Sequence, residues 1–179
     1  MKEYRKHSWI DPRIETKSST KGMGMFAHAP IKEGESVIMW GGKVFTNEEK
    51  KRGLVKKYTG SRIDENHWLG GDLDEPEQED QYLNHSCDPN IWLIDEVTFN
   101  ARRDISKGEE ITADYSTWSI DDTWVMDEPC RCGSSLCRHT VTGKDWQLPE
   151  LQERYKGHFV PFVNEWIEKM KQDNKEAIL

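Results

Sequence analysis

Four cysteines are the residues of this chain best suited to hold a metal ion. Cys87 stands alone, whereas Cys130, Cys132 and Cys137 lie within eight residues of one another. A C-x-C pair must sit in a turn to aim both thiols at one centre, and Gly133 gives the backbone that freedom. A closed structural zinc site takes four thiolates or imidazoles in a tetrahedron. The three clustered cysteines and Cys87 make one such set, so we predict a zinc site.

Two disulfides, or four idle thiols, are the alternatives to zinc, and His139 is a further candidate ligand. The amino-terminal residues are polar and carry no secretory signal, so we expect a reducing compartment, in which disulfides are rare. A zinc ion on all four cysteines would fix residues 130–138 against residues 84–87. Asn84 and His85 would then lie beside the zinc-bound segment.

Other residues that could do chemistry have two interpretations each when taken alone. Gly22 and Gly24 fit an ordinary tight turn, or a backbone that comes close to a flat ligand. Asn84 and His85 fit buried polar groups that anchor a chain crossing, or ligand-binding groups. Tyr115 fits a core position or a catalytic one.

The bulk of the sequence favours one domain with a carboxy-terminal appendage. Its 179 residues are 35% apolar, which is enough for a sizeable core. The formal net charge of −8 argues against direct binding of nucleic acid, which usually needs a basic face. No apolar run approaches the ~20 residues that span a bilayer. We therefore expect a soluble intracellular protein without membrane contact, cytoplasmic, or nuclear if the source is a eukaryote.

Acidic residues gather in one short segment. Between Gly71 and Asp80 there are six carboxylates and no Lys or Arg. Such a run is either a solvated loop or a patch that attracts a basic peptide. Its members are Asp72, Asp74, Glu75, Glu77, Glu79 and Asp80.

In the first three-quarters of the chain, short strand-like runs alternate with turn-forming residues, as is typical of a β-rich domain. Residues 36–40 and 91–94 are rich in β-branched and aromatic side chains and are bounded by turn-forming residues. Thr46 and Glu49 form a capping box that predicts a short helix, and Gly53 suits its end.

The last quarter predicts two helices. One opens at Pro149 and ends near Gly157, and a second opens at Pro161. In the second helix one face carries apolar side chains, which either pack on the domain or bind a partner. These side chains are Val163, Trp166, Ile167 and Met170.

Four segments resemble the signatures of one family, the SET-domain lysine methyltransferases. Residues 80–90, DQYLNHSCDPN, are similar to its NHSCxPN motif, and residues 101–115 are similar to the motif that runs from RDI through GEE to DY. Residues 21–27 resemble the glycine-containing loop that opens the domain, and the cysteine cluster resembles the zinc-binding post-SET element. Residues 143–151 are similar to the terminal region of compact stand-alone members.

The resemblance implies a mainly β fold with short helices, in which small sheets surround a pseudoknot. We expect a SET domain over residues 8–118 and a zinc-bound post-SET element over 126–141. Residues 145–173 would then form the carboxy-terminal helices packed on the domain.

The resemblance also implies a cofactor, S-adenosylmethionine, and a set of residues that bind it. Tyr115 would in addition orient the amine and the methyl group in line, in a narrow and largely apolar channel. The cofactor-binding residues would be Lys21, Gly22, Met23, Gly24, Asn84, His85 and Tyr115.

Ala113 departs from the family pattern, which has Phe or Tyr two residues before the tyrosine. Either the lysine channel is roomier here, or another aromatic ring fills the space, with Trp68, Trp118 and Trp124 as candidates. The number of methyl groups added is therefore open.

By this resemblance the chain is identified as a protein-lysine N-methyltransferase that acts on a histone or non-histone protein, or on a peptide, of basic character. Two alternatives remain. One is a catalytically silent SET-fold module that binds peptides or scaffolds a complex. The other is a small zinc-binding interaction protein without a cofactor.

Overall fold

The computed structural model describes residues 2–19 and 22–176 of the chain. Short strands make up most of its regular structure, which confirms the mainly β fold with short helices. The strands are β1 (Trp9–Ile10), β2 (Ile14–Ser19), β3 (Gly22–Ala27), β4 (Ser36–Met39), β5 (Lys43–Thr46), β6 (Ser61–Arg62), β7 (His67–Gly70), β8 (Asn84–His85), β9 (Ile91–Leu93), β10 (Thr98–Ala101) and β11 (Glu110–Ala113). The helices are α1 (Asn47–Lys51), α2 (Pro149–Arg154), α3 (Pro161–Glu176) and the 3-10 turns η1 (Glu79–Tyr82), η2 (Tyr115–Thr117) and η3 (Asp145–Gln147).

One sheet brings together the three motifs that lie far apart in the sequence. Its strand order is β2-β3-β11-β8, so the glycine-containing strand, the strand before Tyr115 and the Asn84-His85 pair are neighbours. β3 and β11 are antiparallel, whereas β11 and β8 are parallel, with Thr112 opposite Asn84 and Ala113 opposite His85. Because strand residues opposite one another lie close together, this register brings His85 near Tyr115.

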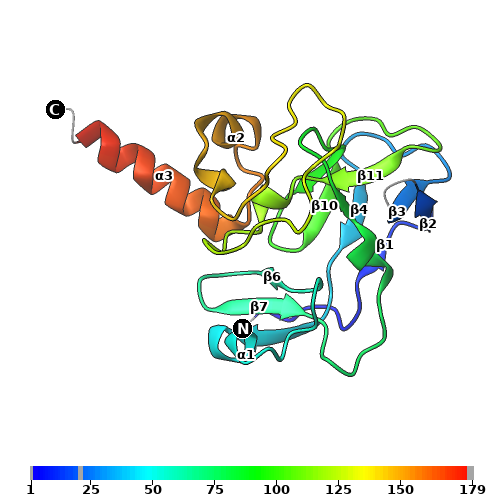
Figure 1. The fold of residues 1–179 in the computed structure, drawn as a ribbon, viewed down its shortest axis with the longest axis horizontal. Coiled ribbons are helices and arrows are strands. Elements are labelled where there is room, and N and C mark those ends of the chain that lie inside the picture. Colours follow the sequence, from blue (N-terminus) through cyan, green and yellow to red (C-terminus); the bar gives the residue numbers. More distant parts are fainter. Residues whose placement is uncertain (1, 20–21, 177–179) are drawn as a thin grey trace.

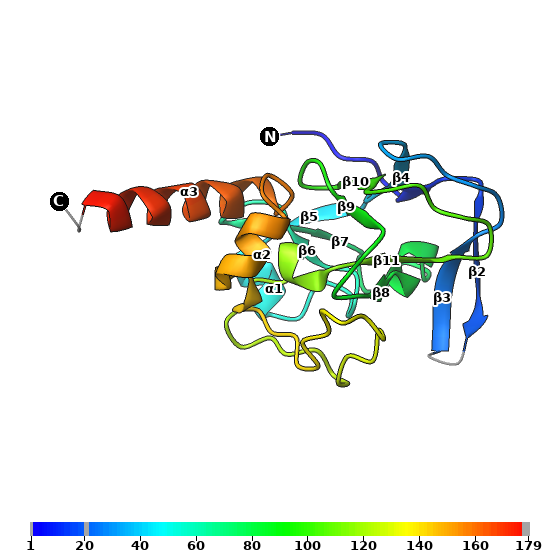
Figure 2. The ribbon, with the colours of Figure 1, turned by 90° about the horizontal axis from the view of Figure 1, so that it is seen from above.

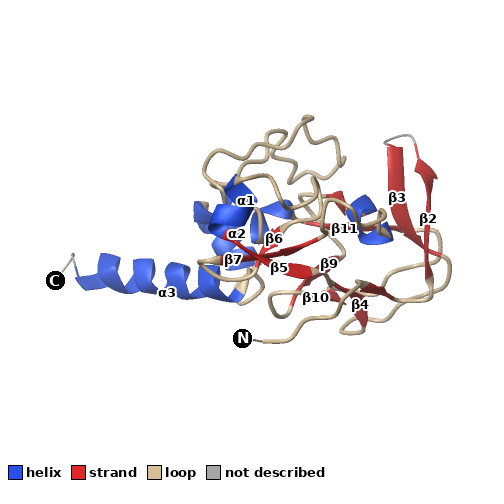
Figure 3. Ribbon diagram, turned by 90° about the horizontal axis from the view of Figure 1, so that it is seen from below, coloured by secondary structure: helices blue, strands red, loops and turns tan. Residues whose placement is uncertain are grey.

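Two further sheets flank this one. The first has the order β1-β4-β10-β9 and the second the order β5-β7-β6. Figure 1 shows the β5-β7-β6 sheet with α1 below the other strands, and Figure 3 shows the β2-β3 hairpin at the end of the molecule opposite α3. The strands expected over residues 36–40 and 91–94 are β4 and β9.

The helix α1 starts as its sequence predicts. The Thr46 side chain accepts a hydrogen bond from the Glu49 backbone N–H, and the Glu49 carboxylate accepts one from the Thr46 N–H, so the capping box is confirmed. The helix ends at Lys51, and Gly53 follows with a φ of 74°.

Both carboxy-terminal helices pack into the main core. Leu151, Tyr155 and Val163 are fully buried in the same cluster as the strand residues. α2 ends at Arg154, three residues before Gly157, because the chain turns there and buries Tyr155. On α3, Ile167 is buried but Met170 is 40% exposed, so the expected packing face is wrong at Met170.

The reason is that α3 leaves the body of the molecule after its first half. Figure 1 shows its later turns extending away from the strands. Within the described residues, no helix is both long enough and apolar enough to cross a membrane.

The segment between η2 and η3 is irregular and covers one side of the site. Figure 2 shows these loops, coloured yellow-green to yellow, beneath β8 and β11. A bridge between Val125 and Thr142 holds their two ends together. Gly143 packs directly against the backbone of Asp121, where a side chain would clash. Backbone contacts, one buried ion pair and the apolar cluster around Cys87, Cys130 and Val141 hold the loops in place.

That ion pair joins Asp114, at the end of β11, to Arg138, in the cysteine-containing segment. Two guanidinium nitrogens of Arg138 donate to the two carboxylate oxygens of Asp114, each over 2.7 Å. The third nitrogen, Nε, donates to Asp145 over 2.9 Å, and the Tyr155 hydroxyl donates to Asp114 over 3.1 Å. Asp114 is 1% exposed. Burial alone would raise its pKa, but the guanidinium holds the pKa below its usual value.

We predict that Arg138→Met lowers the free energy of unfolding by about 3–5 kcal/mol, because it leaves the buried Asp114 carboxylate without a counter-ion. Urea denaturation measures this change. Arg103→Met is the matched control, since the Arg103 ion pair with Glu109 lies at the surface, and it should cost less than about 1 kcal/mol. Equal effects of the two substitutions would contradict the role given to Arg138.

Candidate functional site

Tyr115 lies at the centre of the site, directly after the buried Asp114. Its hydroxyl donates a hydrogen bond of 2.6 Å to the backbone oxygen of Leu83. Burial raises the pKa of Tyr115 to about 12, and the charge of Glu110 adds to the effect. At neutral pH the side chain is therefore a protonated phenol with a fixed orientation.

Two cavities meet at Tyr115. The larger has a volume of about 790 Å³ and is lined by Asn84, His85 and the loop from Ser119 to Cys132, among others. The smaller has a volume of about 200 Å³. We call them the large cavity and the small chamber. Both are lined by Tyr58, Gly60, Tyr115, Trp118, Ser119 and Trp124.

Asn84 forms side-chain hydrogen bonds that connect β8 to the glycine-containing strand β3 and to β11. Its side-chain Nδ2 donates to the backbone oxygen of Met23 over 3.0 Å and to Glu110 over 2.8 Å. A Cβ at Gly24 would lie 2.7 Å from the Glu110 carboxylate and 3.0 Å from Asn84 Nδ2. The space beside Gly24 is thus taken by protein side chains, and a role of its backbone in cofactor binding stays a prediction.

His85 is held from both ring nitrogens. Nδ1 accepts a hydrogen bond of 3.2 Å from the Tyr115 N–H, so the ring proton sits on Nε2, which faces the Cys87 sulfur at 3.3 Å. Burial lowers the pKa of His85 to about 4, against the opposing effect of Asp114. The imidazole is therefore neutral at physiological pH, and it links Tyr115 to the cysteine cluster.

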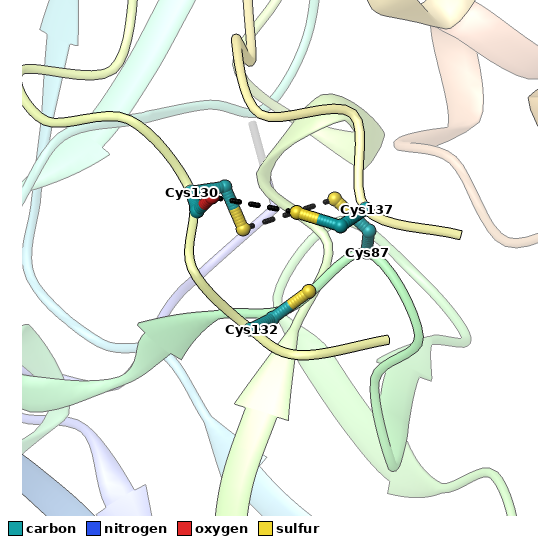
Figure 4. A group of neighbouring side chains, drawn as sticks. All are labelled: Cys87, Cys130, Cys132 and Cys137. Atoms are coloured by element: carbon teal, nitrogen blue, oxygen red, sulfur yellow. Dashed lines mark hydrogen bonds between the residues drawn. The ribbon is translucent and has the colours of Figure 1, made fainter. Parts of the chain in front are cut away.

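The four cysteine sulfurs come together as predicted. All lie within 4.8 Å of one another, and Figure 4 shows the four side chains pointing toward a common centre. The Cys87 and Cys130 sulfurs are 3.9 Å apart. Thiolates at about 2.3 Å from a tetrahedral zinc ion are separated by about 3.8 Å, so the set has the right size for zinc. All four thiols are free, so the two-disulfide alternative is not observed.

Two further groups of the protein contact the Cys87 sulfur of this cluster. The Arg138 N–H donates to the Cys87 sulfur over 3.3 Å, in addition to the contact from His85. Such donors stabilise a thiolate and orient it toward a metal. His139 Nδ1 lies 3.9 Å from the Cys137 sulfur, but the four thiols complete the set without it. The residues present therefore fit a structural zinc ion.

The structure brings some of the expected site residues together and leaves others apart. Asn84, His85, Tyr115 and Trp118 line the large cavity, as do Trp68 and Trp124. Met23 and Gly24 adjoin Asn84 but are not in the cavity walls, and Lys21 lies outside the described residues. Gly22 has a φ of 102°, which suits glycine.

Ala113 is 1% exposed and belongs to the main core. It lines neither of the two cavities, whereas the Trp118 ring lies 5.3 Å from the Tyr115 ring. The role of Ala113 in a lysine channel stays a prediction.

Several lining residues were not found from the sequence. Trp40, Tyr58 and Ser61 of the small chamber come from segments without a recognisable motif. Asp80 is the first residue of the motif segment 80–90, so the sequence did indicate that it lies near the site. The small chamber is lined by both aromatic and polar side chains.

The acidic run over residues 71–80 is mostly a solvated loop. Asp72 pairs with Lys43 over 2.8 Å, and Glu77 accepts from the Tyr82 hydroxyl over 3.0 Å. Asp80 differs from the other members because it faces the small chamber.

Comparison with known proteins identifies relatives of this chain. The chain is 27% identical over 161 residues to the histone-lysine N-methyltransferase ash1 of Drosophila melanogaster, which covers 79% of this chain and 7% of that protein. It is 32% identical over 143 residues to the histone-lysine N-methyltransferase set1 of Dictyostelium discoideum, which covers 70% of this chain and 9% of that protein. The chain thus spans less than a tenth of the length of either relative.

A solved structure shows the same fold. The methyltransferase domain of human histone-lysine N-methyltransferase SETMAR matches with a TM-score of 0.59 and 22% identity, over 73% of this chain and 58% of that one. The family model of the SET domain matches residues 22–116, just over half of the chain. The sequence motifs, the fold and the family model agree, and the chain belongs to the SET-domain family.

Proposed function

We propose that this protein transfers methyl groups from S-adenosylmethionine to the ε-amine of a lysine in a protein substrate. The family supports this, as do the names of the relatives. The observation that carries the proposal is the position of Tyr115, in the wall that the large cavity shares with the small chamber. A transfer between two molecules needs a binding space for each and a point at which they meet. Tyr115 lies at that point.

The large cavity suits the methyl donor. S-adenosylmethionine would supply a methyl group already activated on a sulfonium. Asn84 and His85 line this cavity at the end near Tyr115, and Trp118 and Trp124 offer flat faces to an adenine ring. The same walls carry carboxylates, among them Asp127 and Glu128, and cationic groups, among them Lys50 and Arg131, so they suit a donor that bears charges of both signs.

Tyr115 acts by orientation in this proposal. Its raised pKa, about 12, means that it holds its proton at neutral pH. Its hydroxyl is tied to the Leu83 carbonyl, so the ring and the oxygen stay fixed while an amine approaches. A fixed dipole beside the reacting atoms lowers the barrier without any movement of the protein.

The substrate class is a protein or peptide of basic character. The chain carries a net charge of −8, which favours a substrate of the opposite charge. Histones and other basic proteins meet this description, and we expect the protein to act inside the cell. The proposed divisions are a SET domain over 8–118, a post-SET element over 126–141 and a helical appendage over 145–173.

We further propose that the four cysteines hold a structural zinc ion. The support is the spacing of the four thiols, their free state, and the contacts of the Arg138 N–H and the His85 Nε2 with the Cys87 sulfur. The ion would fix the loop that carries Cys130 and Cys132, and both residues line the large cavity. Zinc binding and cofactor binding are therefore expected to be linked.

We predict about one equivalent of zinc per chain, and its loss in Cys132→Ser, because a structural site needs all four ligands. The variant should melt at a lower temperature and bind S-adenosylhomocysteine more weakly. Elemental analysis and calorimetric titration measure these effects.

Ser135→Ala is the matched control for this substitution, because Ser135 is exposed in the same loop and supplies no thiol. It should keep both zinc and affinity. Protein that folds fully and binds S-adenosylhomocysteine without zinc would rule out the structural role.

We predict that Tyr115→Phe folds normally and transfers methyl groups at least ~100-fold more slowly, the usual scale for losing one positioned polar group. Transfer of a tritiated methyl group to a histone mixture measures the rate. Tyr82→Phe removes a hydroxyl that bonds to Glu77 outside the site, and it should stay within about twofold of the wild-type rate. A Tyr115→Phe variant with normal turnover would refute the assignment.

The proposed activity itself is tested with labelled S-adenosylmethionine in a cell extract, followed by mass spectrometry of the labelled proteins. We expect methyl-lysine in at least one protein, and no label with Tyr115→Phe. A protein that binds the donor but labels no lysine would instead be a silent SET-fold module.

A further inference from the structure

Two contacts from the carboxy-terminal helices reach the short turn η2, whose first residue is Tyr115. One comes from a side chain, because the hydroxyl of Tyr155, the residue after α2, donates to Oδ2 of Asp114 over 3.1 Å. The other comes from the backbone, because the N–H of Val160, the residue before α3, donates to the Thr117 oxygen over 2.9 Å. The helices therefore hold the turn at both of its ends.

The Asp114 carboxylate sets the direction in which this turn starts. Its Oδ1 accepts hydrogen bonds from the backbone N–H of Ser116 over 3.1 Å and from the Ser116 hydroxyl over 2.8 Å. A side chain that caps the first turn of a helix in this way fixes the path of the backbone that enters it. Tyr115 lies between these two residues, so a rotation of the carboxylate would tilt the Tyr115 backbone and move its ring.

Tyr155 reaches Asp114 at a cost that a phenylalanine would avoid. The residue is fully buried, and burial raises the pKa of its phenol, so the hydroxyl is a donor at neutral pH. A phenylalanine ring would fill the same space without a polar group that must leave water. Arg138 already neutralises Asp114 with two hydrogen bonds. Charge balance therefore does not require the Tyr155 hydroxyl, and its contribution is to orient the carboxylate.

We propose that Tyr155 is a positioning residue for methyl transfer. Its hydroxyl holds the Asp114 carboxylate, and with it the η2 turn, in the orientation that keeps Tyr115 in the wall between the large cavity and the small chamber. Tyr155 itself lines neither cavity, so the carboxy-terminal helices act on turnover without touching donor or substrate. This inference rests on the proposed function for the role of Tyr115 in transfer.

Tyr155→Phe removes this hydroxyl and keeps the ring. We expect kcat for methyl transfer to fall about tenfold, the scale of one hydrogen bond to a charged group. The affinity for S-adenosylhomocysteine should stay within about twofold, because Tyr155 does not line the large cavity. Transfer of a tritiated methyl group to a histone mixture at saturating donor measures kcat, and calorimetric titration measures the affinity.

Ile167→Val is the matched control, because it removes one methyl group from the same helices and involves no polar group. Ile167 is buried in the same core cluster as Tyr155. This control should lower the melting temperature, as the loss of a buried methyl group does, and leave kcat within about twofold. Equal rates of the two variants, measured well below both melting temperatures, would make Tyr155 a stabilising residue only and overturn the proposal.

The double variant Tyr115→Phe/Tyr155→Phe tests whether Tyr155 acts through Tyr115. Residues that act as a unit have non-additive effects, so the double variant should transfer methyl groups within about threefold of the rate of Tyr115→Phe alone. A further loss of about tenfold would place the effect of Tyr155 on another part of the site and contradict the proposal.

A second measurement follows Tyr115 without any transfer reaction. The full-length protein is labelled with 3-fluorotyrosine, and the fluorine signal of Tyr115 is the one missing from the Tyr115→Phe spectrum. In Tyr155→Phe this signal should shift or broaden, because the turn has lost one of its contacts. In Ile167→Val it should stay where it is. An unchanged Tyr115 signal in Tyr155→Phe would overturn the proposal, whatever the rate.

The fluorine measurement needs neither donor nor substrate, so it separates this inference from the proposed function. A shifted signal in a protein that labels no lysine would support the link from Tyr155 to Tyr115 and refute the proposed function. An unchanged signal in a protein that transfers methyl groups would leave the function intact and refute the role of Tyr155.

Discussion

The buried carboxylate of Asp114 is the constraint on which the rest of the structure depends. A charge that is 1% exposed must be neutralised inside the protein. Arg138 does this with two hydrogen bonds, and the Tyr155 hydroxyl adds a third. Three segments that are distant in the sequence are thereby joined at one point: the end of β11, the cysteine-containing loop and the residue after α2. Tyr115 directly follows Asp114, so its backbone is fixed by the same contacts.

The cysteine cluster continues this arrangement on the other side of Arg138. The Arg138 side chain binds Asp114, while its backbone N–H binds the Cys87 sulfur. His85 connects the two groups, since its ring accepts a hydrogen bond from the Tyr115 N–H and faces the Cys87 sulfur. The tyrosine, the histidine and the Cys87 thiol are thus linked by short polar contacts.

Features that depend on local chemistry or on a motif could be predicted from the sequence. The capping box at Thr46 and the set of four cysteines are examples, because residue type alone restricts what such groups can do. The hydrogen bond from Ser8 to Asp80 could not be predicted, because the two residues lie 72 positions apart in the sequence. The close approach of Asn84 and Glu110 to Gly24 could not be predicted either, because only the pairing of β3, β11 and β8 brings these residues together. Met170 has the spacing of the apolar face of α3, but this part of α3 extends beyond the domain on which it would have packed.

The parallel pairing of β8 with β11 has a consequence for the order in which the chain can fold. A ribosome releases β8 well before Arg138 and Tyr155, so the newly made Asp114 carboxylate has neither partner while those residues are still in the exit tunnel. Contacts between distant segments form slowly, since a long loop must close first. The β2-β3 hairpin can form early from local contacts, whereas the space around Tyr115 takes shape only after residue 155 has emerged. Until then the apolar face of β11, with Ile111 and Ala113, lacks its packing partners and is open to chaperones.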